Sequence, residues 1–144
     1  MPPRDIFFCD GRIGRHPVNR TEMTILKGAD DGRDAYTDFQ VLKRFKGNRF
    51  LVRAFPKTGR THQIRVHAQY RHHPIASDEK YGDREFNKQM RQAGLKRLFL
   101  HARSVEFHLV STGQQVKVEA PLDTDLTDCL KMLSIGIDSL LASA

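Results

Sequence analysis

Two short runs of alternating apolar residues, separated by a turn, constrain the fold of this chain more than any other feature. In residues 39–45 the apolar Phe39, Val41 and, after Lys43, Phe45 fall on one face, and in residues 50–55 Phe50, Val52 and Ala54 alternate in the same way, which is the period of a β-strand. The intervening Lys46-Gly47-Asn48 has the composition of a turn. The pattern predicts an antiparallel hairpin with one buried face, and further apolar residues at the intervening positions indicate that the other face is partly covered.

The remaining elements are predicted on either side of this hairpin. Residues 1–20 have the Gly and Pro content of a loop. Further strands are expected at three segments: residues 23–26, 105–109 and 116–120, the last two closing the sheet as a pair. Helices are expected at three more: residues 62–70 with Thr61 as the amino-terminal cap, residues 84–93 with Gly94 as the carboxyl-terminal cap, and residues from 123 or 124 onward. This order predicts a single α+β domain over residues 1–144, with a mixed, mainly antiparallel sheet and flanking helices.

The charge of the chain is concentrated in its middle. Residues 42–103 hold 16 of the 24 Lys and Arg residues but 4 of the 17 Asp and Glu residues. This gives the middle a net charge of +12 against −5 in the rest of the chain, within a total of +7. A basic face that binds a polyanion is the expected consequence, and a solvated basic surface without a partner is the alternative.

The composition argues against several classes of protein. No apolar run approaches the roughly 18 residues of a membrane span, and the first residues lack the apolar core of a secretory signal. Cys9 and Cys129 are far apart in the sequence, so isolated thiols in a reducing compartment are expected, with a disulfide as the alternative. We therefore expect a cytoplasmic protein, with an organelle as the alternative.

The segment from Gly59 to His67 has the most concentrated chemistry, with two Arg and two His in nine residues. Gly59 is expected to let the backbone turn at the strand end. The free N–H groups of the helix that follows, flanked by Arg60 and His62, predict a site for a phosphate or carboxylate. Arg65, one turn further, is expected to pair with a carboxylate and keep it ionised. An ion pair that merely holds the fold is the alternative.

The histidines do not predict a metal site. His62 and His67 are five residues apart and therefore do not share a helix face. No Cys lies near them in the sequence. Cys129 falls near the apolar stripe of the last predicted helix, where packing is the expected role.

Several further motifs follow this segment at fixed spacing. Gly-Arg-Thr-His-Gln-Ile-Arg-Val-His is followed by His73-Pro74-Ile75, by Asp78-x-x-Tyr81-Gly82 and by Leu100-His101-Ala102. In this order they resemble the RluA-type RNA pseudouridine synthases, and residues 78–102 are most similar to the C-type enzymes that modify large-subunit ribosomal RNA. The resemblance covers roughly residues 11–133.

The resemblance implies isomerisation of uridine to pseudouridine in RNA, with no metal and no organic cofactor. It implies that Arg65 is the arginine that pairs with the catalytic aspartate, and that Asp78 and Tyr81 belong to a structural turn near the site. The residues it places at the RNA or along the pocket wall are Arg60, Thr61, His62, Gln63, Ile64, Tyr81 and Leu100. Ser77 stands where many members of the family have Gly.

One family motif is absent from the chain. The nucleophile of the family is an Asp in a His-Arg-Leu-Asp-x-x-Thr-Ser-Gly segment, and neither this segment nor the following Lys-x-Tyr occurs here. The chain therefore corresponds to the carboxyl-terminal half of a catalytic domain, in which Arg65 lacks its aspartate and a sheet edge is expected to be bare.

Three explanations follow from that absence: a fragment or truncated gene product, a chain completed by another polypeptide that supplies the amino-terminal half, or a remnant that only binds RNA. The first is the one we expect. The function implied is RNA pseudouridine synthesis, and a non-catalytic RNA-binding module derived from such an enzyme is the alternative.

Overall fold

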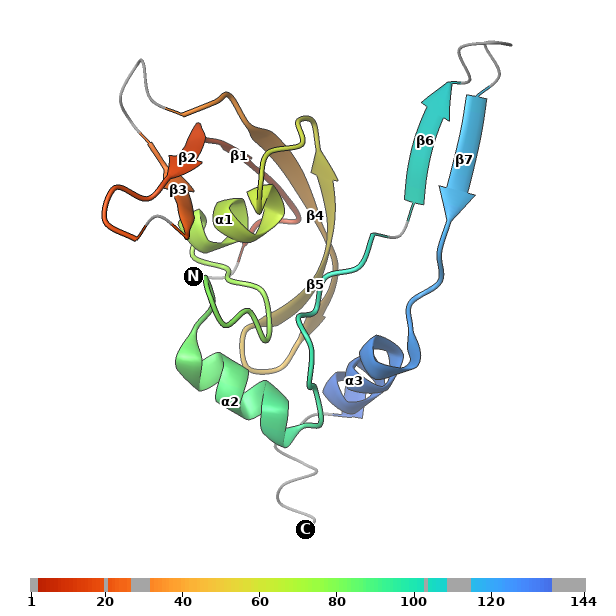
Figure 1. Cartoon of the computed structure of the whole chain (residues 1–144). Helices are drawn as coiled ribbons and strands as arrows, with labels where there is room; N and C mark the ends of the chain where they lie inside the picture. The colour runs from red at the N-terminus through yellow and green to blue at the C-terminus, as the bar shows by residue number, and fades with distance from the viewer. Residues whose placement is uncertain (1–2, 20, 27–31, 103, 109–114, 136–144) are drawn as a thin grey trace.

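The computed structural model describes residues 3–19, 21–26, 32–102, 104–108 and 115–135 (Figure 1). The elements are, in chain order, β1 (Ile6–Asp10), β2 (Ile13–Arg15), β3 (Met23–Ile25), β4 (Tyr36–Phe45), β5 (Arg49–Pro56), α1 (Gln63–Tyr70), α2 (Arg84–Gln92), β6 (Ser104–His108), β7 (Gln115–Glu119) and α3 (Thr124–Ile135). Every pairing between these strands is antiparallel. The predicted α+β class, with a mainly antiparallel sheet and flanking helices, is confirmed.

The predicted hairpin is the centre of the fold. β4 and β5 pair in antiparallel register, with an irregularity between Val41 and Lys43 that displaces Leu42. The turn between the strands places Gly47 at φ 77° and Asn48 at φ 56°. Gly and Asn tolerate this left-handed region best, and their order in the sequence therefore fixes where the hairpin turns.

The interpretation of residues 1–20 as loop is wrong for two segments. β1 pairs with β4 and completes a three-stranded sheet in the order β1-β4-β5. Phe7 and Cys9 of β1 are buried, whereas Ile6 and Phe8 are exposed. Because the run Ile-Phe-Phe-Cys is apolar throughout, the alternation between its two faces is invisible in the sequence. β2 was missed as well, and it pairs with β3.

The strands β6 and β7 pair with each other as predicted, but they do not close the sheet. They form a separate two-stranded sheet, which stands apart from β5 in Figure 1. Among the described strands, β5 pairs only with β4. The sequence contains the signal for each hairpin, but it does not show which sheets share an edge.

Three apolar clusters hold the elements together. Phe7, Cys9 and Phe39 form one cluster, against which Ile64 of α1 packs. A second joins β2, the start of β4 and α1 to Tyr81: Ile13, Ala35, Val66 and Tyr81. The third joins α2 to α3: Met90, Ala93, Leu95, Leu126 and Cys129. Both cysteines are free and buried, as expected for isolated thiols.

The helices begin and end largely where predicted, with one correction. α2 is capped by Asp83, whose side chain accepts from the Phe86 N–H, and Gly94 follows its end at φ 98°. Thr61, however, does not cap α1. His62 occupies the cap position in the left-handed conformation, without a side-chain cap bond, and the helix begins at Gln63. Residues 136–144, the tail considered as an extension of the last helix, lie outside the described residues.

Within the described ranges, none of the helices is both long and apolar enough to cross a membrane.

Candidate functional site

Gln63 shapes the connection between β5 and α1 from inside the protein. Its Oε1 accepts from the Thr58 hydroxyl at 2.6 Å and from the Arg60 backbone N–H at 3.1 Å. Its Nε2 donates to the Tyr36 carbonyl at 2.9 Å and to the Thr37 hydroxyl at 3.0 Å. The four bonds use the full hydrogen-bonding capacity of the amide. Gln63 thereby ties the loop that bears Arg60 to the central strand β4.

Tyr81 links the start of α1 to β3. Its hydroxyl accepts the Met23 N–H at 2.9 Å and lies 2.8 Å from Nδ1 of His62. The Tyr81 hydroxyl can donate to Nδ1 of His62 or accept from it, according to the tautomer of the imidazole. Burial, together with the nearby charges of Arg65 and Lys80, lowers the pKa of His62. The neutral imidazole is therefore favoured, with one ring nitrogen as donor and the other as acceptor.

Arg65 has a carboxylate partner in this chain, contrary to the interpretation from the sequence. Its Nε and Nη2 donate to the two carboxylate oxygens of Asp78, each at 2.9 Å. The guanidinium also lies over the Tyr81 ring, 5.0 Å from its centroid, a favourable cation–π contact. Nη1 has no hydrogen-bond partner among the described residues, and 20% of the Arg65 side chain is exposed. One edge of the guanidinium is therefore available to a second anion.

Asp78 is held more tightly than a surface ion-pair partner. It is 1% exposed and also accepts the backbone N–H groups of Lys80 and Tyr81. Burial by itself would raise its pKa, but the hydrogen bonds from Arg65 and the Tyr81 N–H, with the charge of Arg65, lower the pKa below its usual value. Asp78 is thus a fixed anion that orients Arg65.

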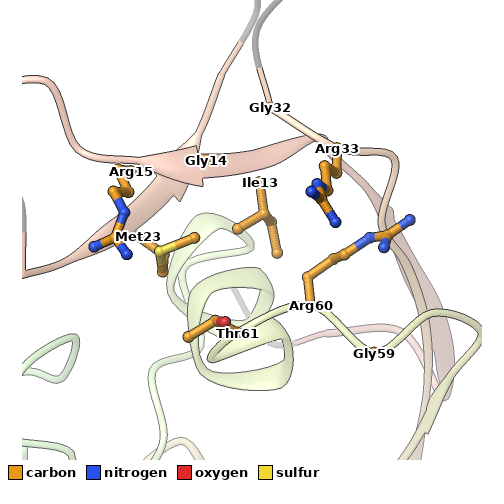
Figure 2. A pocket seen from close by; sticks show the side chains of 9 residues that line it. All are labelled: Ile13, Gly14, Arg15, Met23, Gly32, Arg33, Gly59, Arg60 and Thr61. Carbon is orange, nitrogen blue, oxygen red and sulfur yellow. The ribbon is translucent and has the colours of Figure 1, made fainter.

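A groove lies between the β2–β3 hairpin and the β5–α1 connection (Figure 2). Its lining residues are Ile13, Gly14, Arg15, Met23, Gly32, Arg33, Gly59, Arg60 and Thr61. Met23 belongs to both features, because its side chain lines the groove and its N–H bonds Tyr81. A basic groove therefore adjoins the network of His62, Tyr81 and Arg65.

Comparisons with known proteins show which proteins the chain resembles. A family model described as RNA pseudouridylate synthase matches residues 15–70. The ribosomal large subunit pseudouridine synthase C of Salmonella typhimurium is 50% identical over 111 residues, which cover 76% of this chain and 34% of that protein. The protein of the same name from Pasteurella multocida is 43% identical over 126 residues, covering 85% and 38% respectively. The chain belongs to the RNA pseudouridylate synthase family.

The fold of the chain agrees with two solved structures. Human RNA Pseudouridylate Synthase Domain Containing 1 superposes with a TM-score of 0.70 at 24% identity, covering 94% of this chain and 60% of that one. Human RNA Pseudouridylate Synthase Domain Containing 4 gives a TM-score of 0.65 at 22% identity, covering 90% and 57%. The chain spans about a third of the length of the curated relatives it matches.

The predicted site residues fall into separate groups in the structure. Arg60 and Thr61 line the groove, and His62, Arg65 and Tyr81 form the adjoining network. Ile64 instead packs against the apolar cluster of Phe7, Cys9 and Phe39, and Gln63 is buried. Leu100 is half-buried and does not line the groove.

Gly59 differs from its expected role. Its φ lies outside the left-handed region, and a Cβ added there would meet no atom within 4 Å. The turn at the end of β5 therefore does not require glycine, although Gly59 lines the groove.

Sequence reasoning missed two features of the turn around Asp78. Ser77 has φ 61°, which explains in physical terms why Gly suits this position. A Cβ at Gly82 would lie 2.1 Å from the Asp78 carbonyl oxygen, so that only Gly fits. An Asp followed by backbone N–H groups two and three residues later is a typical side-chain-stabilised turn, and the spacing Asp-x-x-Tyr-Gly was the available signal.

Proposed function

We propose that this chain provides the arginine-bearing, RNA-binding part of an RNA pseudouridine synthase, which isomerises uridine to pseudouridine in large-subunit ribosomal RNA. The observation that carries the proposal is the geometry of Arg65. Asp78 and Tyr81 hold its guanidinium on two sides, and one edge remains available at a partly exposed position. This geometry suits an arginine whose task is to keep a second carboxylate ionised.

The second carboxylate is the nucleophilic Asp of the family, supplied by a segment that this sequence does not contain. We propose that residues 1–144 form one domain that complements this segment, whether it lies on a longer polypeptide or on a separate one. In the reaction the glycosidic bond between N1 and the ribose breaks, the base turns, and C5 bonds to the same ribose carbon, while C5 releases its proton and N1 takes one up. Atoms are conserved, and no cofactor is needed. Because the proposed substrate is ribosomal RNA, we propose that the complex acts in the cytoplasm of a bacterial cell.

Asp78 does not serve as the nucleophile itself. Both of its oxygens accept from Arg65, and the backbone N–H groups of Lys80 and Tyr81 donate to one of them as well. An attacking carboxylate needs a free oxygen at the surface of the pocket, whereas Asp78 is 1% exposed. This observation favours a second candidate function, in which the chain alone binds RNA without catalysis.

Release of tritium from RNA containing 5-tritiated uridine distinguishes the two functions. The chain alone is compared with a chimera that adds the part of the Salmonella typhimurium relative that this chain does not match, provided that part contains His-Arg-Leu-Asp. Under the proposed function, the chimera releases tritium and the chain alone does not. RNA binding without release by either protein would support the binding module.

The variant Arg65→Ala in the same chimera tests the role of the arginine. We expect loss of turnover with much of the RNA affinity retained, because the carboxylate loses its charge partner while the basic groove is unchanged. Arg65→Lys is the matched control, since it keeps the charge but not the two-point contact with Asp78. Near-normal turnover in Arg65→Ala would show that the assigned role is wrong.

A further inference from the structure

Two arginines from different segments point into the same side of the groove. Arg33 precedes β4, and Arg60 follows β5 (Figure 2). We propose that Arg33 and Arg60 together bind one phosphodiester group of the RNA strand. This inference rests on the proposed function in that the ligand is RNA, and it assigns a binding role to Arg33, which sequence reasoning did not select.

The backbone of Arg33 is fixed although its side chain is exposed. Arg33 and Ile13 exchange two backbone hydrogen bonds, each of 2.9 Å, across an isolated antiparallel bridge. Ile13 is buried in the cluster that contains Val66 and Tyr81. Within the described ranges, no hydrogen bond or ion pair engages the Arg33 guanidinium. A fixed backbone with an uncommitted head group is suited to grip an external anion.

Arg60 is oriented by two protein contacts that leave its terminal nitrogens unused. Its Nε donates to the Asp34 carbonyl at 2.8 Å, and its backbone N–H donates to Gln63 at 3.1 Å. Because Asp34 is the neighbour of Arg33, the first contact ties Arg60 to the segment that bears Arg33, and both arginines line the same groove. The Asp34 carboxylate itself lies 3.4 Å from Nε of Arg12. Neither Nη atom of Arg60 bonds another described residue.

Two guanidinium groups that line one groove repel each other, and a shared anion removes that repulsion. A phosphodiester offers two non-bridging oxygens, and each guanidinium presents paired N–H donors that match such oxygens. Phosphate is therefore the favoured ligand over a single carboxylate on a flexible side chain. Contacts of this kind hold an RNA strand in register without reading its sequence.

Gly59 completes the case, because it lines the groove beside Arg60 without any conformational need for glycine. The open space at its Cβ position leaves room for a strand to approach the backbone closely. The absence of a side chain there serves the ligand and not the fold.

The test measures the affinity for a fluorescent single-stranded RNA oligonucleotide at increasing KCl concentrations. Arg33→Ala is expected to weaken binding at low salt and to reduce the slope of log affinity against log salt by at most about 0.7, the value for complete loss of one phosphate contact on a single strand, because Arg60 still faces that phosphate. Arg91→Ala is the matched control, because it removes the same charge from an exposed position on α2 that does not line the groove. The control slope is expected to equal that of the wild type.

Gly59→Ala gives a second, independent measurement. Its added methyl group meets no protein atom within 4 Å, so the thermal midpoint of unfolding is expected to be unchanged. RNA affinity is expected to fall several-fold, because the methyl group occupies the space reserved for the strand.

The outcomes separate this inference from the proposed function. If the wild type shows no salt-dependent RNA binding, both fail. If the wild type binds and Arg33→Ala has the same slope as Arg91→Ala, the two-arginine site is refuted and the proposed function stands. A slope reduced by Arg33→Ala alone supports the inference.

Discussion

Replacing Asp78 tests how Arg65 is held. Asp78→Ala removes a buried carboxylate that accepts from Arg65 and from two backbone N–H groups. Breaking a buried ion pair in this way typically costs about 3–5 kcal/mol. Because 20% of the Arg65 side chain is exposed, its remaining charge is partly solvated, and we expect the lower end, a loss of about 3 kcal/mol.

Asp78→Asn separates charge from shape. The amide keeps an oxygen for the backbone N–H groups of Lys80 and Tyr81 but loses the attraction for Arg65, so the expected loss is smaller, about 2 kcal/mol. Free energies of unfolding from urea titration give both values. The double variant Arg65→Ala/Asp78→Ala closes the cycle, and a coupling of about 1–3 kcal/mol is expected for groups in direct contact.

The pH dependence gives an internal check on the same pair. The pKa of Asp78 is lowered in the folded state from its reference value of 3.8. Its contribution to stability is therefore complete above the unfolded pKa and is lost as the pH falls through the folded pKa. The difference between wild type and Asp78→Ala should shrink below about pH 4. A loss under about 1 kcal/mol at pH 7, or zero coupling to Arg65, would refute the view that Asp78 orients Arg65.

Two further predictions concern Gly82, beside Asp78, and the buried His67. Gly82→Ala is expected to destabilise the fold by about 2 kcal/mol or more, because its Cβ would lie 2.1 Å from the Asp78 carbonyl oxygen. Urea unfolding of this variant and of the Gly59→Ala control, which is expected to be neutral, measures the loss in free energy of unfolding. Equal stability of the two variants would contradict the prediction. His67 is fully buried, with Nδ1 2.8 Å from the Thr37 hydroxyl and Nε2 2.9 Å from the Gly11 carbonyl. Burial lowers its pKa from 6.5, so its contribution to stability is complete above pH 6.5 and declines as the pH falls below that value. Urea unfolding of wild type and His67→Gln at two pH values checks this, and an equal acid sensitivity in the two proteins would rule it out.

Much of the fold could be predicted from local patterns in the sequence. The β4–β5 hairpin has apolar residues that alternate along most of both strands and a turn whose Gly47 and Asn48 adopt positive φ. The α2 helix has a capping Asp83 and a terminating Gly94. In each case the residues that predict the element lie within it or at its ends, so the prediction does not require knowledge of which other segments pack against it.

Each wrong prediction concerns a residue or strand whose structure depends on contacts with residues distant in the sequence. β1 is recognisable as a strand only once β4 is beside it. Thr61 has the chemistry of a helix cap, but His62 takes that position, and its ring is drawn towards the Tyr81 hydroxyl 19 residues along the chain. Asp78, the partner of Arg65, lies in the Asp-x-x-Tyr-Gly motif. The 13 residues between Arg65 and Asp78 span the end of α1 and two turns, and a spacing of this kind does not predict a contact.

The Tyr81 hydroxyl has a consequence for how binding and chemistry communicate. A single oxygen receives the N–H of Met23, in the groove-lining hairpin, and faces Nδ1 of His62. A ligand that displaces the β2–β3 hairpin would withdraw the Met23 N–H from this hydroxyl and so change the hydrogen bonding open to the imidazole. The position of the hairpin and the hydrogen bonding of His62 are therefore linked, and a ligand in the groove that moves the hairpin would affect a side chain it need not touch.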